Sequence, residues 1–119
     1  LIVEDEVTLR ESLRRVLIQE GYEVDSVGSS EAALKTLDEK NYALIITDII
    51  LPGDNGIQLL KKCKEKNPEV KFIIITAFAS IETAVEAIRT GAFDYLVKPI
   101  QHQEIKDTIK KALRSCPSP

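Results

Sequence analysis

The sequence predicts an α/β domain in which a parallel sheet is covered by helices on both faces. Short apolar runs such as ALIIT and FIII alternate along the 119 residues with stretches of helical periodicity. These runs are apolar throughout rather than at every second residue, which indicates strands that are buried on both faces of a sheet. Regular alternation of strand and helix favours parallel pairing. We therefore expect five strands and five helices in one doubly wound domain.

The composition is that of a single globular domain without a strong charge bias. Hydrophobic residues make up 44% of the chain and charged residues 29%, so there is enough apolar material to bury a core. The net charge of −3 gives no general attraction to nucleic acid or to an anionic membrane surface. No apolar run approaches the roughly 18 residues of a membrane span. We therefore expect neither direct nucleic acid contact nor membrane insertion from this domain.

The cysteines and the chain ends indicate where the domain works and how far it extends. Cys63 and Cys116 fit neither a metal knuckle nor a disulfide framework, which favours a reducing compartment and hence the cytoplasm. The chain contains no Met and begins inside an apolar run, so we expect it to be a segment of a longer protein. We expect one domain over residues 1–115, with the linker-like residues 116–119 leading to an output domain outside this sequence.

The helical stretches share apolar residues at three- and four-residue spacing, which is the pattern of a buried helix face. The pair Ser29-Ser30 and the single Ser80 precede two of these stretches as N-terminal caps, and Gly21 and Gly91 end two of them. The apolar positions are Leu9, Leu13, Val16 and Leu17 in the first helix, Ala33, Leu34 and Leu37 in the second, Ile57, Leu60 and Cys63 in the third, Ile81, Val85 and Ile88 in the fourth, and Ile105, Ile109, Ala112 and Leu113 in the fifth.

Polar side chains interrupt four apolar runs, each at the end of a predicted strand. The run LIV is followed by Glu4 and Asp5, and ALIIT is followed by Asp48. The run FIII is followed by Thr76, and YLV is followed by Lys98. In parallel α/β sheets, ligands bind beyond the carboxyl ends of the strands. We therefore expect these five side chains to meet at one edge of the sheet.

The five side chains suit the handling of a divalent cation and a phosphoryl group. Three carboxylates in one place repel one another, and oxygen-only ligands of this kind select Mg²⁺. Asp48 is the candidate nucleophile, since aspartate forms a covalent phosphoryl intermediate in known enzymes. The ammonium of Lys98 and the hydroxyl of Thr76 can neutralise and bind the phosphoryl oxygens. A cis peptide bond before Pro99 would hold Lys98 inward.

Four segments of the chain together resemble one known family. They are VEDE around the first acidic pair, IITDIILPGDNG around Asp48, IIITAFAS around Thr76 and GAFDYLVKPI around Lys98. In this order and at these strand ends, they resemble the receiver domain of two-component response regulators over essentially the whole chain. The resemblance implies a flavodoxin-like, doubly wound fold with strand order 2-1-3-4-5.

The resemblance also implies a role for each residue of the acidic pocket. Asp48 is expected to be the phosphoacceptor for a sensor histidine kinase. Asp5 and Asp48 are expected to bind Mg²⁺ together with the main-chain carbonyl of Ile50. Glu4 stands where the family more often has Asp, and it is expected to act mostly through water.

A conformational switch is a further implication of the resemblance. Thr76 is expected to move toward a new phosphoryl group, and Tyr95 is expected to turn inward into the vacated space. Residues 80–113 would then form the output surface and a possible dimerisation face. Phosphorylation can bias this equilibrium only through contacts that differ between the two states.

The stretch TAFASIETAVEAIRTGAFDYLVKP is most similar to receivers of the nitrogen-regulation type, which control an ATPase that activates an alternative sigma factor and a DNA-binding domain. We therefore expect a phosphorylation-activated module that switches an attached output domain in transcription regulation. A stand-alone receiver and a kinase-fused receiver in a phosphorelay are the alternatives, because output domains are grafted freely onto one fold. A degenerate receiver is disfavoured, because the acids, the threonine and the lysine are all present.

A phosphohydrolase that works through an aspartyl phosphate would share the nucleophile, the metal and the lysine. Such enzymes place a second Asp two residues after the first as general acid, and Ile50 stands there instead. We therefore expect no enzymatic activity beyond self-phosphorylation from a donor and slow autodephosphorylation. Ile50 and Phe78 are expected to flank the path of the attacking water without orienting it, which predicts a long-lived phosphoryl group.

Overall fold

The computed structural model describes residues 1–77 and 79–114 of the chain. The strands are β1 (Ile2–Val3), β2 (Ser26–Val27), β3 (Leu44–Asp48), β4 (Lys71–Thr76) and β5 (Asp94–Val97). They form one parallel sheet in the order β2-β1-β3-β4-β5, which confirms the predicted topology. Phe78 and the linker predicted at residues 116–119 lie outside the described residues.

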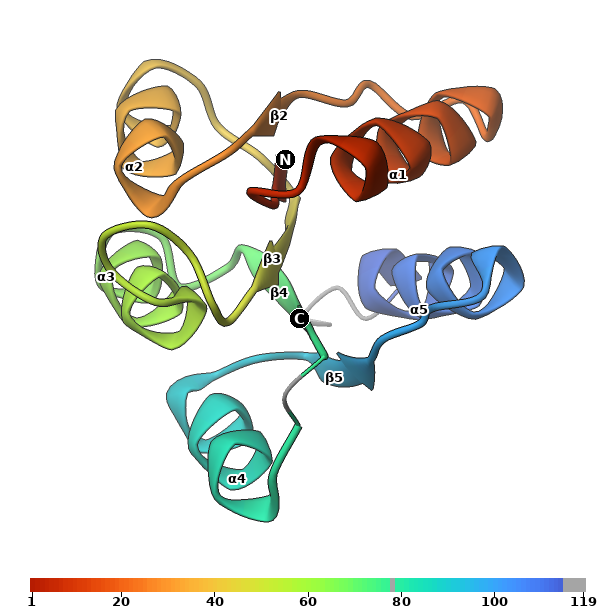
Figure 1. Ribbon diagram of the computed structural model, residues 1–119. Helices are drawn as coiled ribbons and strands as arrows, with labels where there is room; N and C mark the ends of the chain where they lie inside the picture. The colour runs from red at the N-terminus through yellow and green to blue at the C-terminus, as the bar shows by residue number, and fades with distance from the viewer. Residues whose placement is uncertain (78, 115–119) are drawn as a thin grey trace.

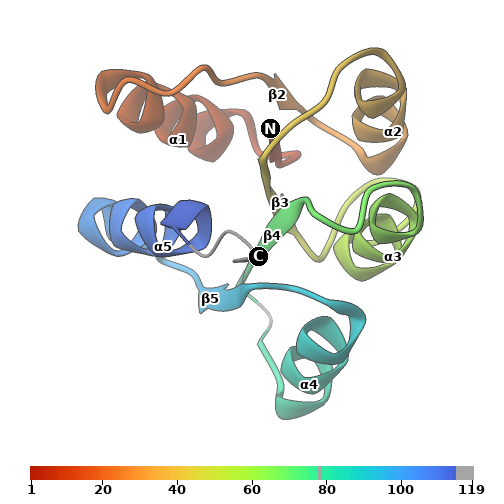
Figure 2. The same cartoon turned by 180° about the vertical axis from the view of Figure 1, so that it is seen from behind.

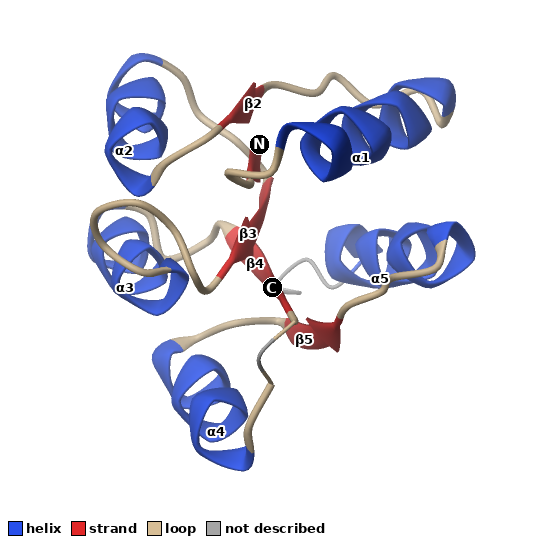
Figure 3. Cartoon of the chain, in the orientation of Figure 1, coloured by secondary structure: helices blue, strands red, loops and turns tan. Residues whose placement is uncertain are grey.

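Five helices cover the sheet, as predicted, and the first four connect successive strands. They are α1 (Val7–Gln19), α2 (Ser30–Glu39), α3 (Gly56–Lys66), α4 (Ile81–Thr90) and α5 (His102–Arg114). Helices α1 and α5 lie on one face, whereas α2, α3 and α4 lie on the other, as seen from opposite sides in Figures 1 and 2 and by element type in Figure 3. Within the described ranges, no helix has the length and apolarity needed to cross a membrane.

The core lies in two layers, one on each face of the sheet. Phe72 and Ile74 of β4 belong to the layer beneath α2, α3 and α4, whereas Ile73 and Ile75 belong to the layer beneath α1 and α5. All four side chains are fully buried. Successive strand residues point to opposite faces, so a strand covered on both sides has to be apolar throughout. This arrangement is the physical reason for the unbroken apolar runs in the sequence.

The serine caps predicted from the sequence are present at the starts of α2 and α4. The Ser29 hydroxyl accepts a hydrogen bond from the N–H of Ala32 at 3.1 Å, at the start of α2. The Ser80 hydroxyl accepts one from the N–H of Thr83 at 3.1 Å, at the start of α4. Gly91 ends α4 with a φ of 121°, a value that favours glycine. These contacts confirm the predicted caps and the predicted helix end.

Helix α4 differs from the other helices in the face that it buries. Its predicted apolar stripe of Ile81, Val85 and Ile88 is exposed, and Ile81 retains 85% of its accessible surface. The helix packs on the sheet through small residues instead, and Ala87 is its fully buried position. Apolar spacing therefore predicted this helix correctly but not which side of it meets the core. The result is an apolar surface on the outside of the domain.

Candidate functional site

The predicted site residues meet at the carboxyl edge of the sheet. Glu4 and Asp5 follow β1, Asp48 and Thr76 are the last residues of β3 and β4, and Lys98 follows β5. The main-chain N–H of Lys98 donates to the carbonyl of Thr76 at 2.8 Å, which holds these two strand ends together. Thr76 itself is fully buried. Parallel pairing brings the ends of β1, β3, β4 and β5 to one edge, and this explains why distant residues converge there.

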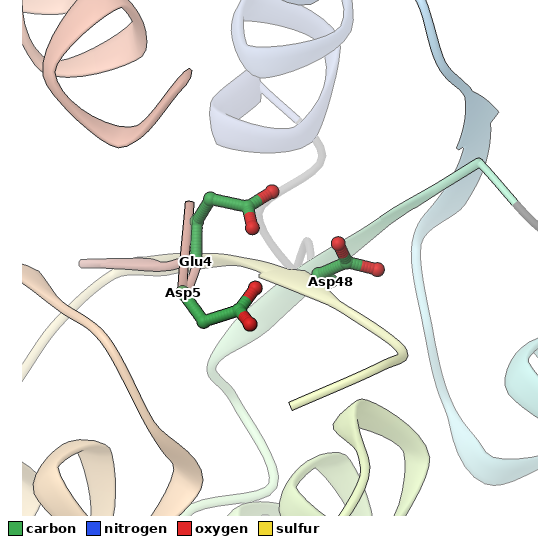
Figure 4. A group of neighbouring side chains, drawn as sticks. All are labelled: Glu4, Asp5 and Asp48. Atoms are coloured by element: carbon green, nitrogen blue, oxygen red, sulfur yellow. The ribbon is translucent and has the colours of Figure 1, made fainter. Parts of the chain in front are cut away.

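Three carboxylates form the centre of the site. One oxygen from each of Glu4, Asp5 and Asp48 lies within 4.8 Å of the other two, and their side chains converge from β3 and the end of β1 (Figure 4). Glu4 and Asp48 are buried, whereas Asp5 is exposed. Like charges at this separation repel strongly in a partly desolvated site. The group therefore needs a positive partner.

Lys98 supplies part of that positive charge. Its Nζ donates to Glu4 Oε1 and to Asp48 Oδ2, each at 2.6 Å, and its side chain is only 16% exposed. Burial alone would lower the pKa of Lys98, but its hydrogen bonds to Asp48 and Glu4 outweigh burial and raise the pKa. The peptide bond between Lys98 and Pro99 is cis, as predicted. The ammonium therefore stays charged between the two buried acids.

Burial and hydrogen bonding act in opposite directions on the carboxyl group of Glu4. Burial raises the pKa of its carboxyl above the ordinary value, and the hydrogen bond from Lys98 offsets only part of this effect. Its Oε2 also accepts the main-chain N–H of Glu6 at 3.1 Å. The side chain is thus held directly by protein groups, and its expected role toward a metal ion through water stays a prediction.

The loop after β3 brings Ile50 to the rim of the site. Its main-chain N–H donates to Asp48 Oδ1 at 3.2 Å, and its side chain is 51% exposed. An apolar, exposed side chain next to Asp48 offers no group that could orient water. The predicted metal contact of the Ile50 carbonyl stays a prediction, and Phe78, the other residue expected beside the water path, lies outside the described residues.

Tyr95 of β5 is connected to the first turn of α4. Its hydroxyl lies 2.8 Å from the hydroxyl of Thr83, which also contacts the Ser80 hydroxyl at 3.0 Å. The ring packs partly buried against the core layer beneath α2, α3 and α4. Sequence reasoning missed Thr83, because the usual partner of a serine cap at this position is Glu or Gln. The Thr83 hydroxyl thus contacts both Tyr95, the predicted switch residue, and Ser80, the cap of α4.

Gly56 is a second residue that sequence reasoning did not single out. Its N–H donates to the carbonyl of Ile49 at 2.7 Å, directly after Asp48. A Cβ atom at Gly56 would overlap the carbonyl oxygen of Asp48 and would lie 2.9 Å from the carbonyl carbon of Asp48. The start of α3 can therefore approach the phosphoacceptor candidate this closely only without a side chain. The dense turn formers of LPGDNG were the available signal.

The donor set fits a hard divalent cation. All three converging ligand groups are carboxylates, with no nitrogen or sulfur ligand among them. Mg²⁺ characteristically binds through one or two carboxylates plus water and phosphate oxygens. A parallel sheet with these acids, a buried threonine and a lysine at its carboxyl edge defines the class of receiver-type signalling domains.

Comparison with known proteins agrees with this class. The chain belongs to the response regulator receiver domain family, which it matches over residues 1–110. Receiver domains are regulatory, generally bind Mg²⁺ at an acidic pocket and work with histidine kinases and output domains. The fold and the family predicted from the sequence are therefore confirmed.

Its relatives include transcription regulators of the nitrogen-regulation type. The chain is 40% identical over 113 residues to the transcriptional regulatory protein ZraR of Salmonella typhimurium, covering 95% of this chain and 26% of that protein. It is 32% identical over 115 residues to the DNA-binding transcriptional regulator NtrC of Azospirillum brasilense, covering 97% and 24%. The solution structure of the beryllofluoride-activated NtrC4 receiver domain dimer superimposes with a TM-score of 0.91 and 34% identity, covering 95% of this chain and 93% of that chain. The chain thus spans about a quarter of the length of the curated relatives.

Proposed function

We propose that this domain accepts a phosphoryl group on Asp48 from a sensor histidine kinase and thereby switches an output domain of a transcription regulator. The observation that carries the proposal is the environment of Asp48. Its carboxylate is buried and converges with the carboxylates of Glu4 and Asp5. It also accepts a hydrogen bond from the ammonium of Lys98 at 2.6 Å. The longer relatives support an attached output domain over a stand-alone or kinase-fused receiver. The cytoplasmic location stays a prediction.

In the proposed reaction, a carboxylate oxygen of Asp48 attacks the phosphorus of the kinase phosphohistidine. The bond from phosphorus to the histidine nitrogen breaks, and the nitrogen keeps its electron pair. Lys98 already contacts Asp48 and can follow the negative charge onto the transferred phosphoryl group, where Thr76 binds another oxygen. Held by Asp5, Asp48 and the carbonyl of Ile50, Mg²⁺ would supply the remaining charge neutralisation.

Incubation with Mg²⁺ and acetyl phosphate, followed by intact mass measurement, tests the acceptor. We expect one added phosphoryl group on the parent protein and none on Asp48→Asn, because the nucleophile is then absent. Asp54→Asn is the matched control, since Asp54 lies in the same loop but pairs with Lys62 on the surface. This control should gain the phosphoryl group. A parent protein without added mass would refute the proposed function.

The lifetime of the phosphoryl group should depend on Ile50 and Phe78. Neither side chain can orient an attacking water, so we expect slow autodephosphorylation of the parent. Ile50→Asn combined with Phe78→Glu should hydrolyse faster, by roughly tenfold or more, because polar groups then position the water. The loss of radiolabelled phosphate over time measures the rate. Equal or slower loss from the double variant would show that these positions do not control hydrolysis.

The switch is proposed to run through Thr76 and Tyr95. The contact between the hydroxyls of Tyr95 and Thr83 holds the Tyr95 side chain at the first turn of α4. An inward turn of Tyr95 toward a displaced Thr76 would break this contact and alter the cap of α4. Phosphorylation would favour that state by its contacts to Thr76 and Lys98.

The exposed stripe of α4 is proposed to mediate dimerisation within residues 80–113. Ile81 and Ile88 are exposed on α4 and Val97 is exposed nearby in sequence on β5, and the related NtrC4 receiver is described as an activated dimer. Beryllofluoride with Mg²⁺ should convert the parent from monomer to dimer in analytical ultracentrifugation. Ile81→Lys with Ile88→Lys should stay monomeric, because charged side chains cannot be buried there. Ile18→Lys, an exposed isoleucine on α1, should dimerise as the parent does.

A further inference from the structure

We infer that Arg10 and Ser30 are positioning residues that hold the two metal-ligand loops in place through the loop between β2 and α2. The ligand loops are residues 4–6 after β1 and residues 49–55 after β3. The connecting loop is defined as residues 28–30, which include Ser30, the first residue of α2. This inference rests on the proposed function, because it concerns Mg²⁺ binding at the site described above. It assigns a role to a loop that contributes none of the three carboxylates.

Arg10 binds the first ligand loop and occupies the space beside Gly28 of the connecting loop. Its Nη1 donates to the main-chain carbonyl of Glu4 at 2.9 Å. A Cβ atom at Gly28 would lie 2.8 Å from the same Nη1 and 3.9 Å from the Glu4 carbonyl oxygen, so the guanidinium fits against a position that has no side chain. The Glu4 carbonyl belongs to the peptide unit that leads into Asp5, whose side chain reaches toward Asp48 (Figure 4). The hydrogen bond therefore restrains the orientation of the peptide plane between Glu4 and Asp5, and with it the position of the Asp5 side chain.

Ser30 connects the second ligand loop to the start of α2. Its side chain is 1% exposed, and its hydroxyl donates to the carbonyl of Pro52 at 3.1 Å. A Cβ atom at Gly53 would lie 3.1 Å from the Ser30 hydroxyl, so the loop approaches α2 closely at this point. Pro52 lies two residues after Ile50, whose carbonyl is a proposed ligand. The contact therefore restrains the segment that carries this ligand.

The two contacts act on Mg²⁺ through geometry. Mg²⁺ demands near-octahedral ligand placement, so a small displacement of Asp5 or of the Ile50 carbonyl weakens binding. Hydrogen bonds that orient metal ligands typically change metal affinity by about 10–100-fold when they are removed. Arg10 also carries a positive charge, and loss of this charge alone would tighten the binding of a cation. The direction of the change in affinity therefore separates positioning from charge.

Titration of the whole domain with MgCl₂ by calorimetry or by amide NMR shifts tests the inference. Arg10→Gln and Ser30→Ala should each weaken Mg²⁺ binding, by roughly tenfold. Gly28→Ala should weaken it in the same direction, because it keeps the charge of Arg10 but places a Cβ atom 2.8 Å from Nη1. The phosphorylation rate at saturating Mg²⁺ should change much less than the dissociation constant does.

Two neighbouring residues provide matched controls. Arg14→Gln makes the same change of charge one turn further along α1, where Arg14 is exposed. Ser29→Ala removes the cap of α2 and leaves the Ser30 hydroxyl in place. We expect Ser29→Ala to lower the thermal unfolding midpoint and both controls to keep the Mg²⁺ affinity of the parent.

The possible results lead to different conclusions. A parent protein that binds no Mg²⁺ refutes the proposed function itself. A parent that binds Mg²⁺, with Arg10→Gln, Gly28→Ala and Ser30→Ala all within about twofold of it, refutes the inference alone. Tighter binding by Arg10→Gln refutes its positioning role in favour of its charge. Weaker binding by the three variants, with unchanged controls, supports the inference.

Discussion

Replacing Gly56 by alanine is expected to destabilise the domain severely, by roughly 3 kcal/mol or more. The added Cβ would overlap the carbonyl oxygen of Asp48 and would lie 3.0 Å from the Cα of Ile49. These are main-chain atoms, so no side-chain rotation can relieve the overlap. The start of α3 and the main chain at Asp48 must therefore move apart, which displaces the phosphoacceptor candidate. Urea unfolding measures the loss of stability, and acetyl phosphate labelling measures the loss of acceptor activity.

Gly21→Ala separates this steric effect from backbone strain. Gly21 follows α1 with a φ of 91°, and a Cβ atom there would meet no atom within 4 Å. Alanine at Gly21 should cost about 1–2 kcal/mol for the left-handed backbone alone. It should leave phosphorylation unchanged, because Gly21 lies away from the carboxyl edge. A Gly56→Ala protein as stable as Gly21→Ala would contradict the close approach of α3 to Asp48.

The fold was predictable because its signals are local in the sequence. The strand Lys71–Thr76 is an unbroken apolar run ended by a polar residue, and both features follow from burial on two faces. The edge strand Ser26–Val27 is only half-buried, and its apolar signal is correspondingly weak. The alternation of elements, rather than this segment alone, predicted it. The local spacing of apolar residues thus indicates whether a segment is a helix or a strand, whereas the burial of that segment depends on the neighbouring elements.

The site was predictable in outline, because strand ends in a parallel sheet share one edge. Glu4 and Lys98 are 94 positions apart in the sequence, and this rule still brings them together. The rule does not tell which carboxylate the ammonium contacts. That choice depends on burial of the acids, since the desolvated carboxylates of Glu4 and Asp48 gain most from a direct partner.

Contacts that orient the site left no pattern in the sequence. Arg10 lies on a helix among other charged residues, and nothing local distinguishes it from Arg14. Its contact with Glu4 and the space at Gly28 follow from the spacing between two loops. The spacing of the apolar stripe on α4 did not reveal that the stripe is exposed, because a periodic apolar stripe fits a partner surface as well as a core. Such features depend on distances that only the assembled fold defines.

Replacing Lys98 by methionine should cost about 3 kcal/mol of stability in metal-free protein near pH 7. The change leaves Glu4 and Asp48 close together in a buried site without their shared ammonium. Burial already raises the pKa of Glu4, and loss of the hydrogen bond from Lys98 raises it further. A carboxyl group with a raised pKa in the folded state binds protons more tightly there than in the unfolded state. The free energy of unfolding should therefore rise as the pH falls toward the ordinary pKa of glutamate.

Urea unfolding of Lys98→Met near pH 7 and near pH 5, with and without Mg²⁺, measures this effect. The variant should regain stability at the lower pH, where Glu4 takes up a proton, and should gain more from Mg²⁺ than the parent does. Lys62→Met is the matched control, because Lys62 pairs with Asp54 at the surface and should lose no more than about 1 kcal/mol. An equal response to pH and to Mg²⁺ in Lys98→Met and the parent would show that the ammonium does not balance the buried acids. The larger response would identify Lys98 as the cation that substitutes for the metal ion in the resting site.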